Sequence, residues 1–558
     1  MRSLFRKKTI SQLQDSPSNH PSSLQRILGV RDLTFMGIAA VVGAGIFSTI
    51  GSAAFHGGPG VSILFILTAV TCGFSALCYA EFASRVPIAG SAYTYSYVVF
   101  GEIIAWIIGW ALILEYAIGN IVVAISWSGY FNNLLVHVFH IELPSWMLVD
   151  PVTAQHAFEQ ATKALANPAS LSIQQLEMYQ FAVNSYHTAP HIGGTPLFFN
   201  LPAFIIVALV TYLAYSGIKE SKKSTNWMVL FKIAVILFVI IAGAFFVDTN
   251  NWTPFMPNGF SGVLKGVSAV FYAYIGFDAI STMAEESKNP QRDLPRGMIY
   301  SLLICSVLYI LIALILTGIE NYSQFGGVAD PLAFVFEKRA PWIEKIISVS
   351  AVVATTSVLL VFQIGQPRIW MSMSRDGLLP KKFQQLNKFQ IPGFATLLTG
   401  LIVGVGSLFL QAGIVTDLTS IGTLFAFVLV SGGVLFLPVV EKKPGQFKLP
   451  SWSGRYLISG IVLLFIYLSN QRLLDSFQQF LAGIYTEIPF LLFTILSVVI
   501  MFYTIIKNYA FIPVMGVLSC LYLLIEIPPG SWKWFFVWMA LGLIVYFLYG
   551  KKHSKLNQ

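Results

Sequence analysis

Charged residues are scarce in this sequence, since Asp, Glu, Lys and Arg together make up 11% of its 558 residues. Soluble globular proteins carry about 25%. Cysteine is also rare, and the four cysteines lie in apolar segments without metal-ligand spacing. The low charge excludes an ordinary soluble protein, and the cysteine pattern excludes a disulfide framework or a cysteine metal site. A cleavable signal peptide is not visible, because the N-terminal stretch is polar and basic.

Long hydrophobic runs dominate instead, and hydrophobic residues make up 56% of the chain. A membrane-spanning helix needs about 20 apolar residues. The sequence therefore predicts an all-α integral membrane protein with about fourteen spans. These are placed at residues 33–54, 61–84, 101–125, 200–217, 227–247, 262–284, 298–318, 344–366, 394–412, 419–439, 456–470, 485–506, 509–526 and 532–549.

Lysine and arginine are distributed unevenly among the predicted loops. If the N-terminus is cytoplasmic, most of the 34 Lys and Arg residues fall on the inside, as the positive-inside rule requires. We therefore expect both termini in the cytoplasm and the polar insertion 139–199 outside. The short termini favour a bacterial inner membrane. The outside-facing sequons at Asn251 and Asn321 leave a eukaryotic plasma membrane open.

Glycines interrupt two of the predicted spans near their middles. Gly43 and Gly45 interrupt the first span, and Gly276 interrupts the sixth within the run 271–278. Backbone groups inside a membrane need partners, so such breaks are tolerated where they line an enclosed cavity. Freed N–H groups can bind a carboxylate, and paired breaks in two halves of a chain indicate a transporter's binding site. Close helix packing through small residues is the alternative interpretation.

Ionisable side chains inside spans are costly and indicate function. Lys232 in span 5 is predicted either to hold elements together as a bound sodium ion would, and to couple protons, or to reach the cytoplasmic surface. Glu115 in span 3 needs a partner or a proton. Asp278 is either a helix cap or part of a proton relay. Lys265 lies two turns before Tyr272, so it is predicted on the same face, towards the outer vestibule or as an anchor.

Other polar groups are interpreted as structural. Glu81 and Arg85 are predicted to pair along one helix. The segments 285–290 and 368–377 are placed on cytoplasmic loops. The hydroxyls of Thr355, Thr356 and Ser357 in span 8 either bond their own helix carbonyls or face a cation near Lys232.

Several motifs together resemble the cationic amino acid transporter branch of the amino acid–polyamine–organocation superfamily. The similarity covers about residues 24–440, apart from the insertion. The matching stretches are Gly43-Ala44-Gly45-Ile46-Phe47, Tyr79-Ala80-Glu81-Phe82, Leu114-Glu115-Tyr116, residues 271–278, Glu285-Glu286, Asn289-Pro290 and residues 367–380. Lys265 and the long insertion depart from the pattern and leave the preference for cationic substrates open.

This resemblance implies the leucine-transporter fold, with spans 1–5 and 6–10 as inverted repeats and four further spans. The implied organisation is a cytoplasmic tail at 1–30, repeats at 31–247 and 261–440, the extra spans at 454–550 and a tail at 551–558. It also implies a midplane amino acid site, with Lys232 in the sodium position. The implied substrate contacts are Val41, Gly43, Ala44, Gly45, Ile46, Tyr272, Ala273, Ile275, Ala354 and Thr355. The expected ion-coupling residues are Lys232, Thr356, Ser357, Asp278 and Glu115.

The expected function is secondary active, proton-coupled and sodium-independent uptake of an amino acid by alternating access. An amino acid or amine exchanger and a sensor without sustained transport are the alternatives. No enzyme activity and no cofactor other than the coupling proton are expected, because no catalytic constellation lies at membrane depth. The expected partners are an amino acid and the lipid bilayer. Nucleic acid is not expected, and a small single-span protein or a lipid partner is left open.

Overall fold

A computed structural model describes residues 5–8, 24–166, 173–328, 330–337, 339–437 and 446–557. Its α-helices are α2 (Val30–Val41), α3 (Ile50–Gly57), α4 (Val61–Arg85), α5 (Ala92–Val99), α6 (Glu102–Leu134), α7 (Pro151–Leu165), α8 (Ile173–Thr188), α9 (Leu201–Tyr215), α10 (Ile218–Ala244), α11 (Gly259–Leu264), α12 (Val267–Tyr272), α13 (Pro290–Ile319), α14 (Pro331–Glu337), α15 (Pro341–Arg375), α16 (Gly393–Phe409), α17 (Ala412–Val434), α18 (Gly454–Leu468), α19 (Asn470–Leu481), α20 (Ile488–Lys507), α21 (Phe511–Ile525), α22 (Pro529–Val545) and α23 (Lys551–His553).

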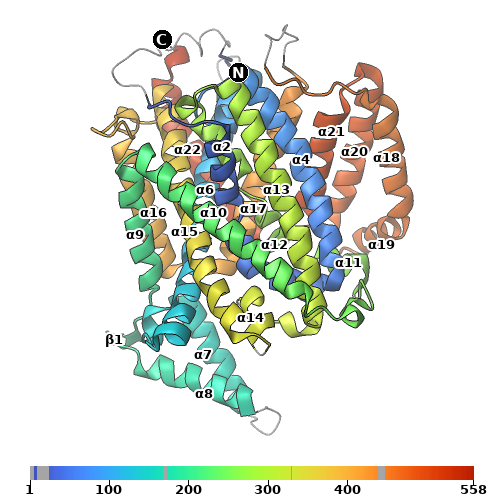
Figure 1. The fold of residues 1–558 in the computed structure, drawn as a ribbon. Helices are drawn as coiled ribbons and strands as arrows, with labels where there is room; N and C mark the ends of the chain where they lie inside the picture. The colour runs from blue at the N-terminus through green and yellow to red at the C-terminus, as the bar shows by residue number, and fades with distance from the viewer. Residues whose placement is uncertain are drawn as a thin grey trace.

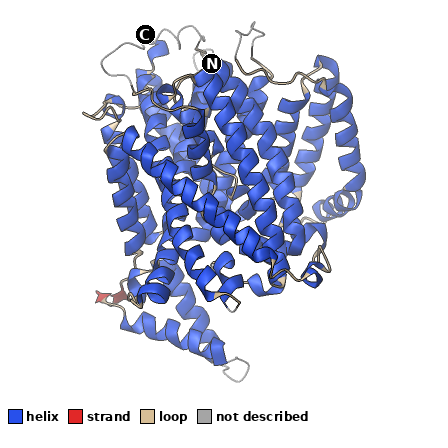
Figure 2. Cartoon of the chain, in the orientation of Figure 1, coloured by secondary structure: helices blue, strands red, loops and turns tan. Residues whose placement is uncertain are grey.

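Shorter 3-10 and π-helical segments interrupt or join these helices. They are η2 (Gly45–Thr49), η3 (Gly58–Gly60), η4 (Leu135–Phe139), η5 (Ser145–Met147), η7 (Thr249–Trp252), η8 (Phe277–Glu286), η9 (Tyr322–Phe325), η10 (Lys381–Gln384), η11 (Tyr546–Gly550) and η12 (Lys555–Asn557). A two-stranded antiparallel sheet of β1 (His191–Ile192) and β2 (Thr195–Pro196) lies beside α7 and α8 (Figure 2).

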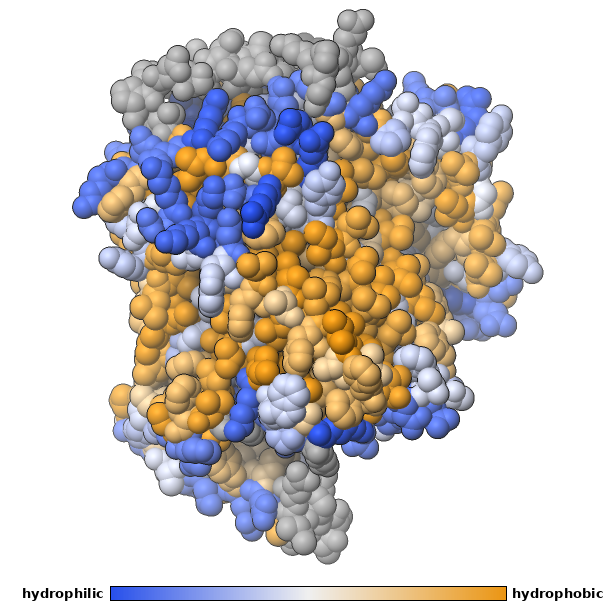
Figure 3. Space-filling model, viewed as in Figure 1, coloured by the Kyte–Doolittle hydropathy of each residue, from blue (hydrophilic) through white to orange (hydrophobic). Residues whose placement is uncertain are grey.

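The helices form one bundle whose two ends differ (Figure 1). Both chain ends lie on one side, here called the termini side, and α7 and α8 extend beyond the opposite side. A broad band of apolar side chains lies between bluer, more polar ends (Figure 3). Such a band is what the hydrocarbon core of a bilayer requires. The predicted all-helical membrane protein is confirmed.

The described residues contain both long and short apolar helices. Within the described residues, nine helices are long and apolar enough to span, or ten if the α18–α19 pair, bent by 64°, is one span. The stretch Val30–Arg85 counts as one of these nine, although it contains α2, α3 and α4. Three shorter apolar helices are α9, α16 and α21. The count of fourteen spans stays a prediction.

α6 and α15 occupy the centre of the bundle and pack against each other. In the most apolar stretch of α6, 83% of the residues are buried, whereas in that of α20 the share is 28%. α13 packs on both α2 and α4, and α17 packs on α6. The central helices therefore face protein on most sides, while α18, α20 and α22 expose apolar side chains at the periphery. This arrangement places the two glycine-interrupted segments inside the protein.

Two sequence-based interpretations are wrong. Arg368 is not on a loop, because α15 continues to Arg375 and buries the Arg368 side chain against Glu286. Lys265 and Tyr272 do not share a continuous helix face, because α11 ends at Leu264 and α12 begins at Val267. The side chain of Lys265 is exposed.

Other expectations for local structure are confirmed. Arg85 Nε donates to Glu81 Oε1 over 2.8 Å. The polar insertion contains α7 and α8 where its composition is helical. The Asp150 side chain caps α7 by accepting from the backbone N–H groups of Val152 and Thr153.

Candidate functional site

The first interrupted segment consists of α2 and η2 with a short extended link between them. α2 ends at Val41, Val42 adopts φ −82° and ψ 97°, and helical backbone resumes at Gly45. Among the hydrogen bonds of the described residues, the N–H groups of Gly43, Ala44 and Gly45 donate to no acceptor. Free N–H groups at the start of a helix form a favourable site for a carboxylate.

The second interrupted segment consists of α12 and η8. α12 ends at Tyr272, and Gly276 has φ 121°, a conformation that strongly favours glycine. The turn between them is closed by the N–H of Ile275, which donates to the carbonyl of Tyr272 over 3.3 Å. Helical backbone resumes at Phe277 and reaches Glu286 with a kink at Met283. This segment therefore brings backbone carbonyls and a charged residue, Asp278, to the interior.

The two breaks pack directly against each other. A Cβ atom on Gly45 would lie 2.3 Å from the Cα of Ala273. A Cβ atom on Gly276 would lie 2.7 Å from the Cβ of Ala40. Close packing through the glycines is therefore present, together with backbone N–H groups that lack acceptors, and carboxylate binding stays a prediction.

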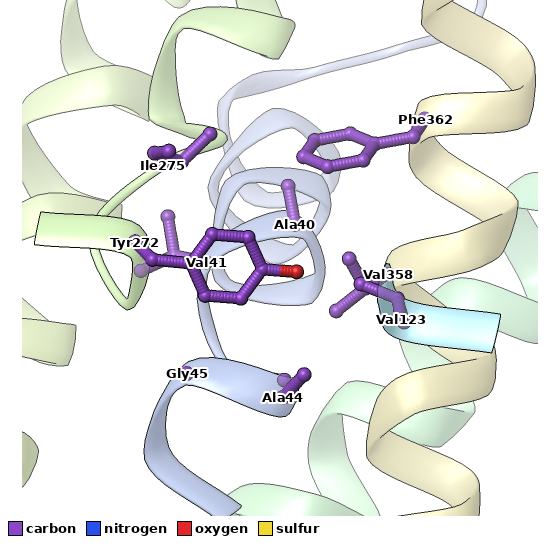
Figure 4. Close-up of a pocket in the computed structure, with 10 residues that line it drawn as sticks. Ala40, Val41, Ala44, Gly45, Val123, Tyr272, Ile275, Val358 and Phe362 are labelled. Carbon is purple, nitrogen blue, oxygen red and sulfur yellow. The ribbon is translucent and has the colours of Figure 1, made fainter. Parts of the chain in front are cut away.

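A small cavity lies where the two breaks meet α6 and α15 (Figure 4). The cavity is small, and the empty space of about 240 Å³ around it includes space that is open to solvent. The wall includes the sequence-predicted residues Val41, Gly43, Ala44, Gly45, Tyr272 and Ile275. It also includes Ala40, Val123, Val358 and Phe362, which the sequence did not indicate. Apart from the Tyr272 hydroxyl, the side chains of this wall are apolar. Such a wall can contact an apolar group of a ligand.

Four other predicted contacts lie outside the cavity wall. Ala273 packs against Gly45, and the N–H of Ile46 donates to the carbonyl of Gly43 within the link. Ala354 is buried, and the Thr355 hydroxyl donates to its own helix at the carbonyl of Ala351 over 2.6 Å. Val358 and Phe362 lie one and two turns further along α15 and face the cavity instead.

Lys232 on α10 reaches the broken end of α2. Its side chain is fully buried, so it does not extend to the surface of the membrane. The Nζ atom donates to the carbonyl of Ala39 over 3.1 Å, to the carbonyl of Val42 over 2.7 Å and to the hydroxyl of Ser357 over 2.9 Å. An ammonium group has three donors, so its hydrogen bonds are complete.

This ammonium group joins three helices. Ala39 lies in the last turn of α2 and Val42 directly follows the helix, at the end where the helix dipole favours a cation. Ser357 belongs to α15 and also donates to the carbonyl of Ala354 over 2.7 Å. A positive charge at this point therefore holds α2, α10 and α15 together immediately beside the N–H groups of the first break.

The comparison with known sequences agrees with this geometry. A family model described as amino acid permease matches residues 28–550. The chain belongs to the amino acid permease family. The branched-chain amino acid permease BcaP of Bacillus subtilis is 38% identical over 100% of this chain and 99% of its own length. The methylthioribose transporter of Bacillus subtilis is 36% identical over 100% of both chains. The vacuolar cationic amino acid transporter 2 of Arabidopsis thaliana is 36% identical over 81% of this chain and 65% of its own length.

These relatives confirm that the permease belongs to the predicted superfamily. They are named as permeases or transporters, and not as enzymes. The membrane-spanning helices and the amino acid permease match together establish a multi-pass membrane permease.

The remaining predicted ion-coupling residues of the permease are not in one place. The Thr356 hydroxyl accepts from Trp127 Nε1 over 2.8 Å and donates to the carbonyl of Val352, so it does not contact Lys232. Asp278 is buried, and the Tyr116 hydroxyl lies 3.5 Å from its Oδ2 atom. Glu115 is buried on α6, and its Oε2 atom has no hydrogen-bond partner within the described chain.

Glu115 and Asp278 form a second polar region inside the permease. Tyr116, the residue after Glu115, places its hydroxyl 3.5 Å from Asp278 Oδ2, and the Cβ of Glu115 is close to Gly422 on α17. Neither carboxyl group forms an ion pair with a described residue. Two buried acids without a cationic partner disfavour two simultaneous negative charges, which makes this region suitable for holding a proton.

On the termini side, the ends of the two interrupted segments are tied together. The N–H groups of Ile27 and Leu28 both donate to the carbonyl of Glu286 over 3.0 Å. The Glu286 carboxylate pairs with Arg368 over 2.6 Å, and both side chains are 1% exposed. This ion pair fixes the end of η8 to α15.

The chain ends of the permease meet at Glu102, the first residue of α6. Its buried carboxylate accepts from the hydroxyls of Tyr97 over 3.0 Å, Tyr546 over 2.9 Å and Ser554 over 2.5 Å. The N–H of Glu102 donates to the carbonyl of Arg6 over 3.0 Å. Residues from both ends of the chain therefore hydrogen-bond to Glu102.

We expect Glu102→Ala to lower the thermal unfolding midpoint of the purified permease. The change leaves three hydroxyls without their acceptor, and one orphaned buried group costs about 1–3 kcal/mol. Glu220→Ala is the matched control, because Glu220 also lies in the first turn of a helix but is exposed. The control should change stability by less than about 0.5 kcal/mol. Equal midpoints for the two variants would contradict a structural role for Glu102.

Proposed function

We propose that the permease imports a small neutral amino acid by alternating access. The observation that carries this proposal is the cavity at the two breaks, where unpaired N–H groups adjoin an apolar wall. The N–H groups of Gly43, Ala44 and Gly45 would bind the α-carboxylate. Val123, Val358 and Phe362 would contact the side chain. The similarity to BcaP supports an aliphatic substrate.

Neutral substrates are favoured over cationic ones because the cavity wall contains no acidic side chain among the described residues. A cationic side chain in an apolar pocket would lose its hydration without gaining a partner. The amino group of the substrate would bind carbonyls of the second break, at Tyr272, Ala273 and Ile275. Ile46, Ala354 and Thr355 would act indirectly, by shaping the segments that carry the wall.

Proton coupling without sodium is the second part of the proposal. The ammonium group of Lys232 occupies the position beside the Ala39 and Val42 carbonyls and the Ser357 hydroxyl. A sodium ion would need the same oxygen atoms as ligands. Glu115 and Asp278 would hold a proton during the cycle. Thr356 would stabilise α15 against α6 through Trp127.

The leucine-transporter fold and fourteen spans complete the proposed architecture. The position of the two breaks, in the first and sixth predicted spans, supports inverted repeats. The excess of Lys and Arg in the loops of the termini side supports a cytoplasmic location for both termini. The insertion with α7 and α8 would then lie outside a bacterial inner membrane.

The test is uptake by the purified full chain in liposomes that contain no amino acid. We expect labelled isoleucine or valine to accumulate under an inward proton gradient, and a sodium gradient alone to have no effect. Uptake only after preloading with amino acid would replace import by exchange, and binding without uptake would indicate a sensor. Accumulation of labelled methylthioribose without amino acid uptake would overturn the substrate class.

A further inference from the structure

One polar atom of the cavity has no role in the proposed backbone contacts. The Tyr272 side chain is 6% exposed, and its hydroxyl has no hydrogen-bond partner among the described residues. The ring extends from the end of α12 across the cavity, and its oxygen points between the walls (Figure 4). Buried tyrosine hydroxyls are usually hydrogen-bonded, so this one requires an explanation.

Two nearby tyrosines have paired hydroxyls. The Tyr274 hydroxyl donates to the carbonyl of Phe65 over 3.1 Å. The Tyr309 hydroxyl donates to the carbonyl of Val41 over 2.8 Å. The buried hydroxyls of Tyr79 and Tyr95 also have no hydrogen-bond partner among the described residues, but of these three unpaired tyrosines it is Tyr272 that lines the cavity. Around the Tyr272 hydroxyl, the facing side chains from α6 and α15 are hydrocarbon, namely Val123, Val358 and Phe362. A phenylalanine would cover the same apolar surface without leaving an oxygen unpaired.

We propose that the Tyr272 hydroxyl is a specificity-determining group that hydrogen-bonds a hydroxyl on the substrate's side chain. The proposal rests on the proposed function, and it adds the substrate class: neutral amino acids whose short side chain combines a methyl group with a hydroxyl, as in threonine. The methyl group packs on the valines of the wall. The side-chain hydroxyl completes the hydrogen bonding of Tyr272.

The physical basis is the penalty for an unpaired polar group. Valine has nearly the shape of threonine but cannot bond the Tyr272 hydroxyl, so that oxygen stays unpaired when valine is bound. A site with a buried hydrogen-bonding group discriminates against analogues that lack the matching group. The wild-type permease is therefore expected to prefer threonine over valine.

Tyr272→Phe is the variant that tests this assignment. We expect it to lower the ratio of threonine to valine uptake by about 3–10-fold, the range for one ordinary hydrogen bond. Valine uptake should be unchanged or increased. The unfolding midpoint of the unliganded variant should be equal to or above that of the wild type, because no hydrogen bond within the protein is lost.

Tyr274→Phe is the matched control, since it removes a hydroxyl two residues away that does not face the cavity. It should lower the unfolding midpoint and leave the threonine-to-valine ratio unchanged. An unchanged ratio in Tyr272→Phe overturns the assignment. An equal loss of threonine and valine uptake also overturns it, because the hydroxyl would then contact the α-carboxylate common to both. Failure of the proposed function is distinct, because the wild-type permease would then take up neither amino acid.

Discussion

Lys232→Ala is expected to abolish proton-driven amino acid uptake in liposomes. The variant removes the cation that joins the broken end of α2 to Ser357 on α15. It leaves the Val42 carbonyl without its donor and the Ala39 carbonyl with only the Ser357 hydroxyl, 3.4 Å away, and an orphaned buried group costs about 1–3 kcal/mol. The link that carries the free N–H groups of Gly43 to Gly45 loses its support at the same time. Uptake of labelled valine or threonine under an imposed proton gradient measures the effect.

The matched control for this prediction is Lys223→Ala. Lys223 lies on the same helix, α10, but its side chain is exposed. Its removal should leave uptake within twofold of the wild type, because surface substitutions rarely change stability by more than about 0.5 kcal/mol. Ser357→Ala should be intermediate, since the ammonium group keeps both carbonyl contacts. Proton-driven uptake that persists undiminished in Lys232→Ala would refute the coupling role.

The sequence was sufficient to predict the two interrupted segments and a lysine that has its partners inside the protein. Gly43, Gly45 and Gly276 stand out because glycine is unfavourable in an uninterrupted helix. Lys232 stands out because a lysine surrounded by apolar residues needs partners inside the protein. The glycines and the lysine are recognised from the residue type and from its position within an apolar segment. Hydropathy along the sequence locates such segments.

Positions around the axis of α15 could not be predicted in the same way. Thr355, Thr356 and Ser357 are consecutive, so they point in directions about 100° apart, and only Ser357 contacts Lys232. The rotation of α15 about its axis is set by its packing on α6. A single sequence does not show which helices pack against each other. Ala354, Val358 and Phe362 share one face of α15, so which of them line the cavity depends on its depth along the helix, and the cavity lies at Val358 and Phe362.

Arg368 and Glu286 were missed for a different reason. A charged residue lowers local hydropathy whether it faces water or a partner, so a buried ion pair resembles a loop in the sequence. The pair lies far apart in the chain, with Glu286 at the end of η8 and Arg368 inside α15. Only the tertiary structure shows that the two charges compensate each other.

Arg368→Ala is expected to produce the largest loss of stability among the ion-pair variants. Both partners are 1% exposed, and removal of one member of a buried pair costs about 3–5 kcal/mol because the other charge stays buried. The thermal unfolding midpoint of the purified permease should fall strongly. The paired variant Glu286→Leu with Arg368→Met should recover most of the loss, since it removes both charges and keeps apolar volume.

The neighbouring pair of Glu285 and Arg375 provides the comparison that identifies burial as the cause. Its N–O distance of 2.7 Å is nearly the same, but its side chains are 21% and 35% exposed. A partly exposed pair contributes about 0–1 kcal/mol, so Arg375→Ala should shift the midpoint only slightly. If the two arginine variants lose equal stability, burial does not distinguish the pairs. If the Glu286→Leu, Arg368→Met variant is as unstable as Arg368→Ala, the loss comes from hydrogen bonds such as Arg368 Nη1 to the carbonyl of Ile364 rather than from the unpaired charge.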